Sequence, residues 1–188
     1  MRTLWLVTAL VAVLASPALA QNDIKVLATN KTSTLEKEMN EAAEAGYRFA
    51  TVMGGNTSFG GSEAVVIMTR LDDAKPAWAY RLLATNKTGT MQKELQEAGD
   101  AGYEYRGQTT FKSTFGGKEV VVLLERDTSV ERPEKYEYKL LATKKTSTMQ
   151  KELAEAGAAG YQFVGMTVSD TLMGGSEVVC ILRRKPTT

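Results

Sequence analysis

The sequence contains no histidine and only one cysteine, and these two shortages remove several classes of catalytic site. Without histidine the chain cannot build a Ser-His-Asp or Cys-His nucleophilic system, a histidine general base or a histidine-ligated zinc centre. Cys180, inside the apolar run EVVCILRR, cannot form an internal disulfide or a cluster of thiolate ligands, so we expect a buried, inert thiol there. The residue types that remain favour a non-catalytic module over an enzyme.

Nucleotide-binding and calcium-binding motifs are also missing from the sequence. Neither G-x-x-x-x-G-K-[ST] nor G-x-G-x-x-G occurs, and no D-x-[DN]-x-[DN]-G loop is present. The 23 basic and 22 acidic residues nearly balance, which gives no electrostatic reason to bind nucleic acid or an anionic membrane. We therefore expect no cofactor, no metal and no nucleic-acid partner.

The first 20 residues have the pattern of a secretory signal peptide. Arg2 forms a positive start, residues 4–15 are apolar, Pro17 breaks any helix, and residues 18–20 read A-L-A, a cleavage site. The apolar run is short for a membrane span, which needs about 20 residues. We expect cleavage after Ala20, export to the periplasm or the medium, and no membrane insertion afterwards. Without Arg2, the basic and acidic residues are equal in number.

One segment occurs three times in the remaining chain. ATNKTSTLEKEMNEAAEAGY starts at Ala28, ATNKTGTMQKELQEAGDAGY at Ala84 and ATKKTSTMQKELAEAGAAGY at Ala142. Within the segment no residue is inserted or lost. The repeats predict three copies of one structural unit. We place repeat 1 at 21–71, repeat 2 at 80–127 and repeat 3 at 138–185, with linkers at 72–79 and 128–137 and a tail at 186–188.

Each repeat predicts a strand, a helix and two further strands. The first strand is IKVLAT, YRLLAT or YKLLAT, and the helix follows a polar turn. Its apolar positions have the i, i+4, i+7, i+8 spacing of one helical face; in the first copy these are Leu35, Met39, Ala42 and Ala43. Ser33 with Glu36 and Ser147 with Gln150 have the spacing of a capping box. Gly46, Gly102 and Gly160 suit the residue that ends a helix at positive φ.

The third strand of each repeat is apolar on consecutive residues: EAVVIMTR, EVVVLLER or EVVCILRR. Such a strand is typically buried on both faces, so we expect it in the centre of an antiparallel sheet. The helix covers one face, and the other face needs a second cover because a unit this small rarely folds alone. We expect an α+β protein in which the three sheets pack together in a compact pseudo-threefold body with helices outside. A linear solenoid is the alternative.

The repeats resemble a small bacterial β-α-β-β domain family, the domain of unknown function 4177 type. The likeness is carried by Tyr138-Lys139-Leu140-Leu141, by Ala159-Gly160-Tyr161 and by Arg183-Arg184. Family members often have tryptophan after the glycine, where this chain has tyrosine three times. The resemblance implies a bacterial source and the β-α-β-β fold. It implies no catalytic residue, because no activity is established for that family.

Three sets of residues remain as candidate sites. The strand-to-helix turns carry Lys31-Thr32, Lys87-Thr88 and Lys145-Thr146, where free N–H groups and the helix dipole could hold a small anion. Glu63, Glu119 and Glu177 follow the double glycines and could form a carboxylate ring if the units pack with threefold symmetry. Asn30-Lys31-Thr32, Asn56-Thr57-Ser58 and Asn86-Lys87-Thr88 fit the N-glycosylation sequon, which a bacterial source makes accidental.

The sequence thus predicts an exported bacterial protein that binds a partner or contributes to a structure. The partner is a protein or a small molecule, and the oligomeric state is open. Two alternatives stay open as well: a small-anion or ligand-binding protein that uses the three strand-to-helix turns, and a small hydrolase that works without histidine.

Overall fold

The structure is a computed structural model that describes residues 23–57, 61–70, 75–85, 87–113, 117–170 and 176–186. The signal peptide, the third residue of the sequon at Asn56, Asn86 of another sequon, and most of the double glycines lie outside the described residues.

Each repeat forms the same four elements in the same order, and we call these groups units 1, 2 and 3. Unit 1 has β1 (Asp23–Thr29), α1 (Thr32–Glu44), β2 (Arg48–Thr57) and β3 (Gly61–Arg70). Unit 2 has β4 (Trp78–Thr85), α2 (Thr88–Asp100), β5 (Glu104–Ser113) and β6 (Gly117–Asp127). Unit 3 has β7 (Glu137–Thr143), α3 (Thr146–Ala158), β8 (Gln162–Asp170) and β9 (Ser176–Arg184).

Every unit builds one antiparallel sheet with its third strand in the centre. The strand orders are β1-β3-β2, β4-β6-β5 and β7-β9-β8. This confirms the α+β class, the three β-α-β-β repeats and the central place of the doubly apolar strand. The second strand of each sheet carries a bulge at the same place, after Phe49, Tyr105 and Phe163. Along the described part of the chain, no helix is long and apolar enough to cross a membrane.

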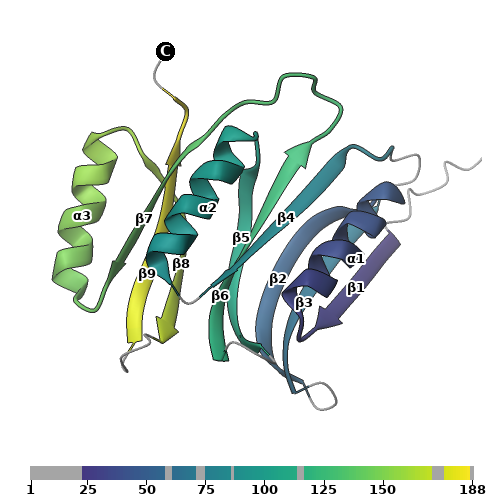
Figure 1. Ribbon diagram of the computed structural model, residues 1–188, viewed down its shortest axis with the longest axis horizontal. Helices are drawn as coiled ribbons and strands as arrows, with labels where there is room; N and C mark the ends of the chain where they lie inside the picture. Colours follow the sequence, from purple (N-terminus) through teal and green to yellow (C-terminus); the bar gives the residue numbers. More distant parts are fainter. Residues whose placement is uncertain are drawn as a thin grey trace, which may run out of the picture.

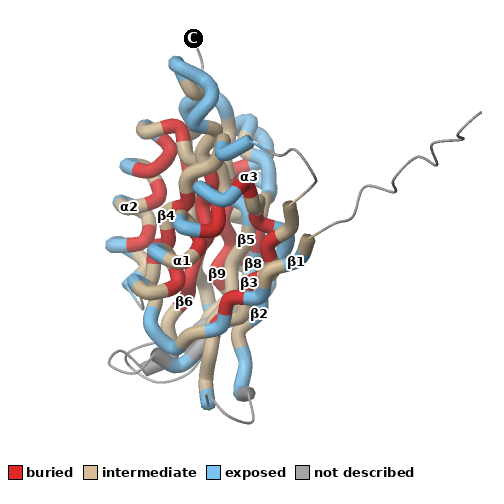
Figure 2. Tube along the Cα trace, turned by 90° about the vertical axis from the view of Figure 1, so that its right-hand side faces the viewer, coloured by how far each residue is buried: buried red, intermediate tan, exposed pale blue. Residues whose placement is uncertain are grey.

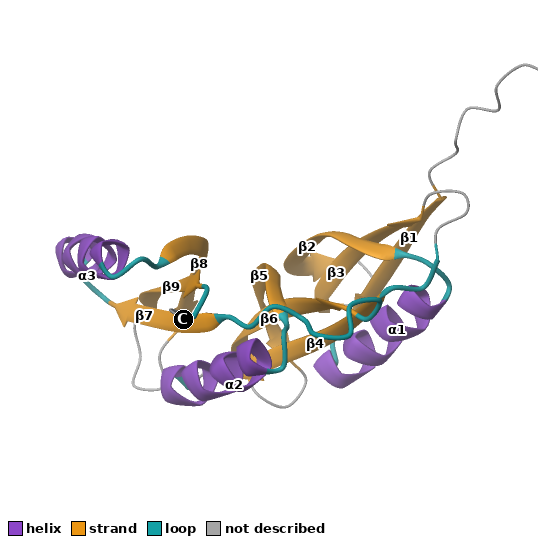
Figure 3. Cartoon of the chain, turned by 90° about the horizontal axis from the view of Figure 1, so that it is seen from above, coloured by secondary structure: helices purple, strands orange, loops and turns teal. Residues whose placement is uncertain are grey.

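The three units stand in a row, with unit 2 between unit 1 and unit 3 (Figure 1). The view from above shows the sheets following one another in the same sequence (Figure 3). The expected pseudo-threefold closure is therefore wrong, and the linear alternative describes the arrangement. The reason lies in what covers the second face of the sheets in units 2 and 3: the preceding unit covers it, not a shared threefold centre. Because each unit covers the sheet of the next unit, the units form a row with two different ends.

The hydrophobic core is accordingly shared between neighbouring units. Helix α1 buries Leu35 and Met39 against its own sheet and, in the same cluster, against Tyr80 and Leu82 of unit 2. Helix α2 does the same with Tyr138 of unit 3. The cluster under α3 contains residues of unit 3 alone. Cys180 is fully buried in that cluster, and burial raises the pKa of its thiol. This agrees with the inert role that the sequence predicts for it.

The C-terminal ends of the three helices are alike, and they are stabilised differently from the N-terminal ends. At the C-terminal ends, Gly46, Gly102 and Gly160 have φ of 87°, 81° and 83°, as expected. In α1, Tyr47 N donates to Ala42 O and Gly46 N to Ala43 O, which is the Schellman pattern. Arg70, Arg126 and Arg184 of the third strands each donate to a carbonyl of the last turn and lie over the following tyrosine ring.

At the N-terminal ends the predicted capping boxes are wrong. The N-cap residues are Lys31, Lys87 and Lys145, and none of them makes a side-chain capping bond. Glu36, which the capping box assigned to the start of its own helix, accepts a hydrogen bond from Leu82 N of unit 2 at 2.7 Å instead. The spacing of a capping box is short and common, and here the same side chain serves the contact between units.

Candidate functional site: the joints and the two open ends

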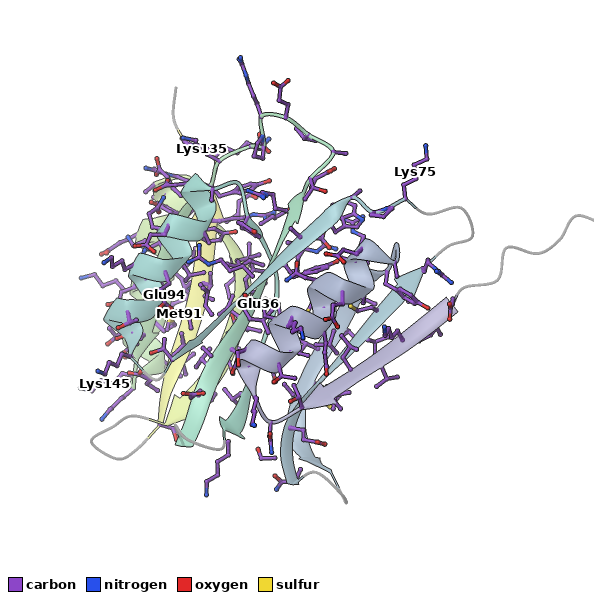
Figure 4. The ribbon with its side chains drawn as sticks, turned by 45° about the vertical axis from the view of Figure 1, so that its right-hand side comes forward. Glu36, Lys75, Met91, Glu94, Lys135 and Lys145 are labelled. Carbon is purple, nitrogen blue, oxygen red and sulfur yellow. The ribbon has the colours of Figure 1, made fainter. Side chains whose placement is uncertain are left out.

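Neighbouring units are joined by side chains of one helix that bind the backbone of the next edge strand. Asn40 of α1 donates to Tyr80 O at 3.0 Å and accepts from Tyr80 N at 2.9 Å, while Glu36 accepts from Leu82 N. Figure 4 shows Glu36 on α1 beside β4. The helix therefore satisfies polar groups of the edge strand β4 that a further strand would otherwise pair.

The second joint repeats this pattern with amide side chains. Gln92 of α2 accepts from Leu140 N at 2.7 Å and donates to Tyr138 O at 2.9 Å. Gln96 accepts from Tyr138 N at 3.1 Å and donates to Tyr136 O at 3.3 Å. Two equivalent residues on each helix, one turn apart, thus hold the next unit in a fixed register.

A tyrosine hydroxyl adds a further bond to each joint. Tyr80 OH accepts from Phe49 N and Tyr138 OH accepts from Tyr105 N, both at 2.7 Å. Burial is the main cause that raises the pKa of both tyrosines above the ordinary value of 10. Burial also raises the pKa of Tyr105, to about 12. Each joint hydroxyl also donates its proton, Tyr80 OH to Glu125 and Tyr138 OH to Tyr103 O.

Each joint also contains an ion pair. The positive and the negative residue exchange their positions between the first joint and the second. In the first joint Arg48 Nη2 lies 2.8 Å from Glu125 Oε1, and Glu125 is 3% exposed. In the second, the positions of Arg48 and Glu125 are taken by Glu104 and Arg183, which form an ion pair of 2.6 Å. The hydrogen bond to Glu125 is the main cause that raises the pKa of Arg48. The Arg48 guanidinium also lies 3.6 Å from the centre of the Trp78 ring.

Close approach of the sheets at the joints depends on glycine. A Cβ on Gly107 would lie 3.2 Å from Val52 and 3.3 Å from Phe49 of unit 1, whereas one on Gly165 would collide with the Tyr105 ring. The equivalent position in unit 1 is Thr51, which has no preceding unit and is exposed.

Among the described residues, nothing covers the outer face of the first sheet, and we call this surface the head face. It consists of Ile24 and Val26 of β1, Met53 of β2, and the half-buried Val65 and Ile67 of β3. Ile24 is 61% exposed and Val26 60%, whereas the equivalent Tyr80 and Leu82 of unit 2 are buried. Figure 2, which looks at the β1 end of the row, shows β1 mostly in the intermediate and exposed colours.

In the part of the chain that the structure describes, the helix side of the third unit is uncovered, and we call this surface the tail face. Phe163, Met166 and Val168 of β8 are more than half exposed, with Leu153 of α3 half-buried beside them. The equivalent Phe49 of unit 1 is buried in the first joint, and the equivalent Leu95 of α2 is fully buried. The two ends of the row are thus unmatched halves of the same kind of joint.

The lysine–threonine turns lie apart from one another, one in each unit. Lys31, Lys87 and Lys145 are exposed at the starts of the three helices, and Figure 4 shows Lys145 at the periphery. Each lysine N–H bonds the threonine hydroxyl two residues earlier, at 3.1–3.2 Å. Thr32 and Thr88 are half-buried and Thr146 is exposed. The hollow beside Lys87 and Thr88 measures about 10 Å³.

The three glutamates that could have formed a ring lie in three separate sheets of the row. Glu63, Glu119 and Glu177 pair with Gly55, Phe111 and Ser169 of their own sheets. Unit 2 stands between the sheets that carry Glu63 and Glu177. The ring required threefold packing, so the row removes the basis for it.

A hollow of about 910 Å³ lies beside the second joint. Its charged lining includes Arg183, Arg184 and Lys185, which are paired with Glu104, Glu137 and Glu134 respectively. The cations of this hollow are therefore neutralised by neighbouring carboxylates. Within the described residues, no group of three or more cysteine, aspartate or glutamate side chains is placed to hold a metal ion.

No family model matches the chain, and no curated protein and no solved structure matches it. The likeness to the domain of unknown function 4177 type thus stays a prediction that depends on the residues quoted for it.

Sequence reasoning did not find the head and tail faces, although the sequence contains a signal for them. Comparison of equivalent positions shows Ile24 where the other units have Tyr80 and Tyr138. It also shows Ala154 where they have Asn40 and Gln96. Once the structure has shown that the units form a row, positions at which only the first or only the last repeat differs from the other two indicate the ends of that row.

Proposed function

We propose that this chain is an exported, non-catalytic bacterial module that binds a macromolecular partner through its head and tail faces. The observation that carries the proposal is the exposure of an apolar sheet face whose equivalents in units 2 and 3 are covered by the preceding unit. Ile24, Val26 and Met53 are 61%, 60% and 72% exposed. Contiguous exposed apolar surface of this kind marks interaction sites in soluble proteins.

The absence of familiar catalytic residue sets supports a binding role over catalysis. The chain contains no histidine, and the buried carboxylate Glu125 is held by Arg48 and by Tyr80 OH within a joint. Its hydrogen bonds serve the contact between units 1 and 2. The signal-like segment at residues 1–20 supports export, which mass spectrometry tests: the exported chain should begin at Gln21.

The binding role is tested by site-specific photo-crosslinking in cells that produce the chain. A photoreactive residue is placed at Val26 in the head face, at Met166 in the tail face and, as a matched control, at Lys93. The Lys93 side chain is 79% exposed on the outer side of α2. We expect discrete adducts from the first two positions and none from Lys93. Equal labelling from all three positions, or none from the faces, would contradict the proposal.

A further inference from the structure

We propose that copies of this chain join head to tail, with the tail face of one copy covering the head face of the next. This inference depends on the proposed function and names the partner as a second copy of the chain. The contact would be heterologous, because two different surfaces of the chain meet. Repetition of such a contact produces either a ring or a filament.

The joints inside the chain are the template for this contact. The helix side of unit 1, which is equivalent to the tail face, covers the outer sheet face of unit 2, which is equivalent to the head face. Unit 2 covers the outer sheet face of unit 3 in the same way. The head side of unit 1 and the tail side of unit 3 are built from the same repeat. Phe163 and Met166 occupy the positions of Phe49 and Val52, which lie against unit 2.

The polar groups at the two ends are complementary as well. Val26 lies opposite Ile67 in the register in which Leu82 lies opposite Leu123, so its N–H points outward from the sheet as that of Leu82 does. Gln150 of α3 is exposed and occupies the position of Glu36 and Gln92. Its amide oxygen is therefore the natural acceptor for Val26 N of a following copy.

The charge pattern also matches head to tail. Each internal joint contains paired charges: Glu125 pairs with Arg48 and with Arg106 of its own unit, and Glu104 pairs with Arg183. At the ends these positions hold Gln162 in the tail and Thr69 in the head, both uncharged. A contact between tail and head thus buries no unpaired charge at this point, which would be costly. If the tail face of another copy replaced unit 2 in the second joint, Arg183 would lose its partner Glu104.

Three differences make the contact between copies weaker than the internal joints. Ile24 lacks the hydroxyl that Tyr80 and Tyr138 use, and Ala154 lacks the amide of Asn40 and Gln96. Thr51 has a Cβ where Gly107 lies close to Phe49. We therefore expect association that depends on concentration, and we expect Thr51→Gly combined with Ala154→Gln to strengthen it.

The test uses sedimentation velocity of the chain from Gln21 onward, over a wide range of concentrations. The unmodified chain should form species larger than a monomer as concentration rises. Val26→Lys blocks the head face and Met166→Lys blocks the tail face; both residues are 60% exposed, so folding, checked by circular dichroism, should be unchanged. Each variant alone should be monomeric, whereas an equimolar mixture should form dimers and nothing larger, because one free head and one free tail remain.

Several outcomes would overturn the inference. A mixture that stays monomeric, an unmodified chain that stays monomeric at every concentration, or no gain from Thr51→Gly with Ala154→Gln would each reject it. Dimerisation of one blocked variant alone would show that two heads or two tails meet instead. If Val26 and Met166 crosslink to other proteins in cells while the isolated chain stays monomeric, the proposed function holds and the self-assembly is rejected.

Discussion

Arg48 donates to the carboxylate of Glu125 through two nitrogens, Nε at 3.2 Å and Nη2 at 2.8 Å, and so links unit 1 to unit 2. In the next joint the chain has glutamate in place of the arginine and arginine in place of the glutamate, as Glu104 and Arg183. The same joint geometry thus accepts either order of charge. This exchange gives a direct test of the joints.

Reversal of the charge at residue 125 alone should lower the free energy of unfolding. Glu125→Arg places a cation beside Arg48 in a buried position, and the loss of one partner of a buried pair costs about 3–5 kcal/mol. The double variant Arg48→Glu with Glu125→Arg restores the pair with its signs exchanged and should recover part of the lost free energy of unfolding. Recovery is incomplete because Arg106, whose Nε lies 3.5 Å from Glu125 Oε1, stays beside the new cation. Urea titration of the wild type and the two variants measures both effects. A double variant that is no more stable than Glu125→Arg would show that the two residues are not coupled.

Asn40→Ala should weaken the first joint. The change removes the partners of Tyr80 N and Tyr80 O, and unsatisfied buried polar groups cost about 1–3 kcal/mol. Gln150→Ala is the matched control, because Gln150 is exposed on α3 and has no following unit within the chain. In a dilute sample the control should stay within about 0.5 kcal/mol of the wild type. Equal midpoints for both variants in urea would contradict the role of Asn40.

Gly102→Val should destabilise the protein more than Gly160→Val. Both glycines have positive φ, where a side chain costs about 1–2 kcal/mol. A Cβ at Gly102 would in addition lie 2.5 Å from Pro133, while Gly160 has open space around it. Lys93→Ala, on the exposed side of α2, should change the unfolding midpoint little. The order Gly102→Val, Gly160→Val, Lys93→Ala from most to least damaging is the expected result in a urea series.

The protein should lose stability as the pH rises above about 10. An unfolded tyrosine ionises near pH 10, whereas burial raises the pKa of Tyr80 and Tyr138 in the folded state. Their contribution is complete below the unfolded pKa and is lost as pH rises toward the folded pKa, because the unfolded state releases the proton first.

Tyr80→Phe isolates this effect. The variant loses the hydroxyl's bonds to Phe49 N and Glu125, so it should be less stable at about pH 7 by roughly 1–3 kcal/mol. Its deficit relative to the wild type should shrink at about pH 11, since the variant has no hydroxyl at this position to ionise. Urea titrations at the two pH values measure this. A deficit that stays constant would show that Tyr80 has the same pKa in both states.

The local structure of one unit could be read from the sequence. The spacing of Leu35, Met39, Ala42 and Ala43 predicts the buried face of α1, and all four residues are buried. The glycines at the helix ends and the central third strand were predicted from equally local signals. Glu36 was misassigned because its partner, Leu82 N, lies in another repeat.

The sequence by itself determined the number of units, their order of elements and the two apolar faces of each sheet, because these follow from side-chain period and backbone preference within a few residues. The tertiary structure decided what covers the second face. Hydrophobic burial is non-directional, so a threefold body and a row can both hide the same apolar residues. Directional contacts decided between them: Asn40 with Tyr80, and Arg48 with Glu125, each join residues of consecutive repeats. Such contacts join each unit to the next, so the head face of unit 1 and the tail face of unit 3 stay exposed.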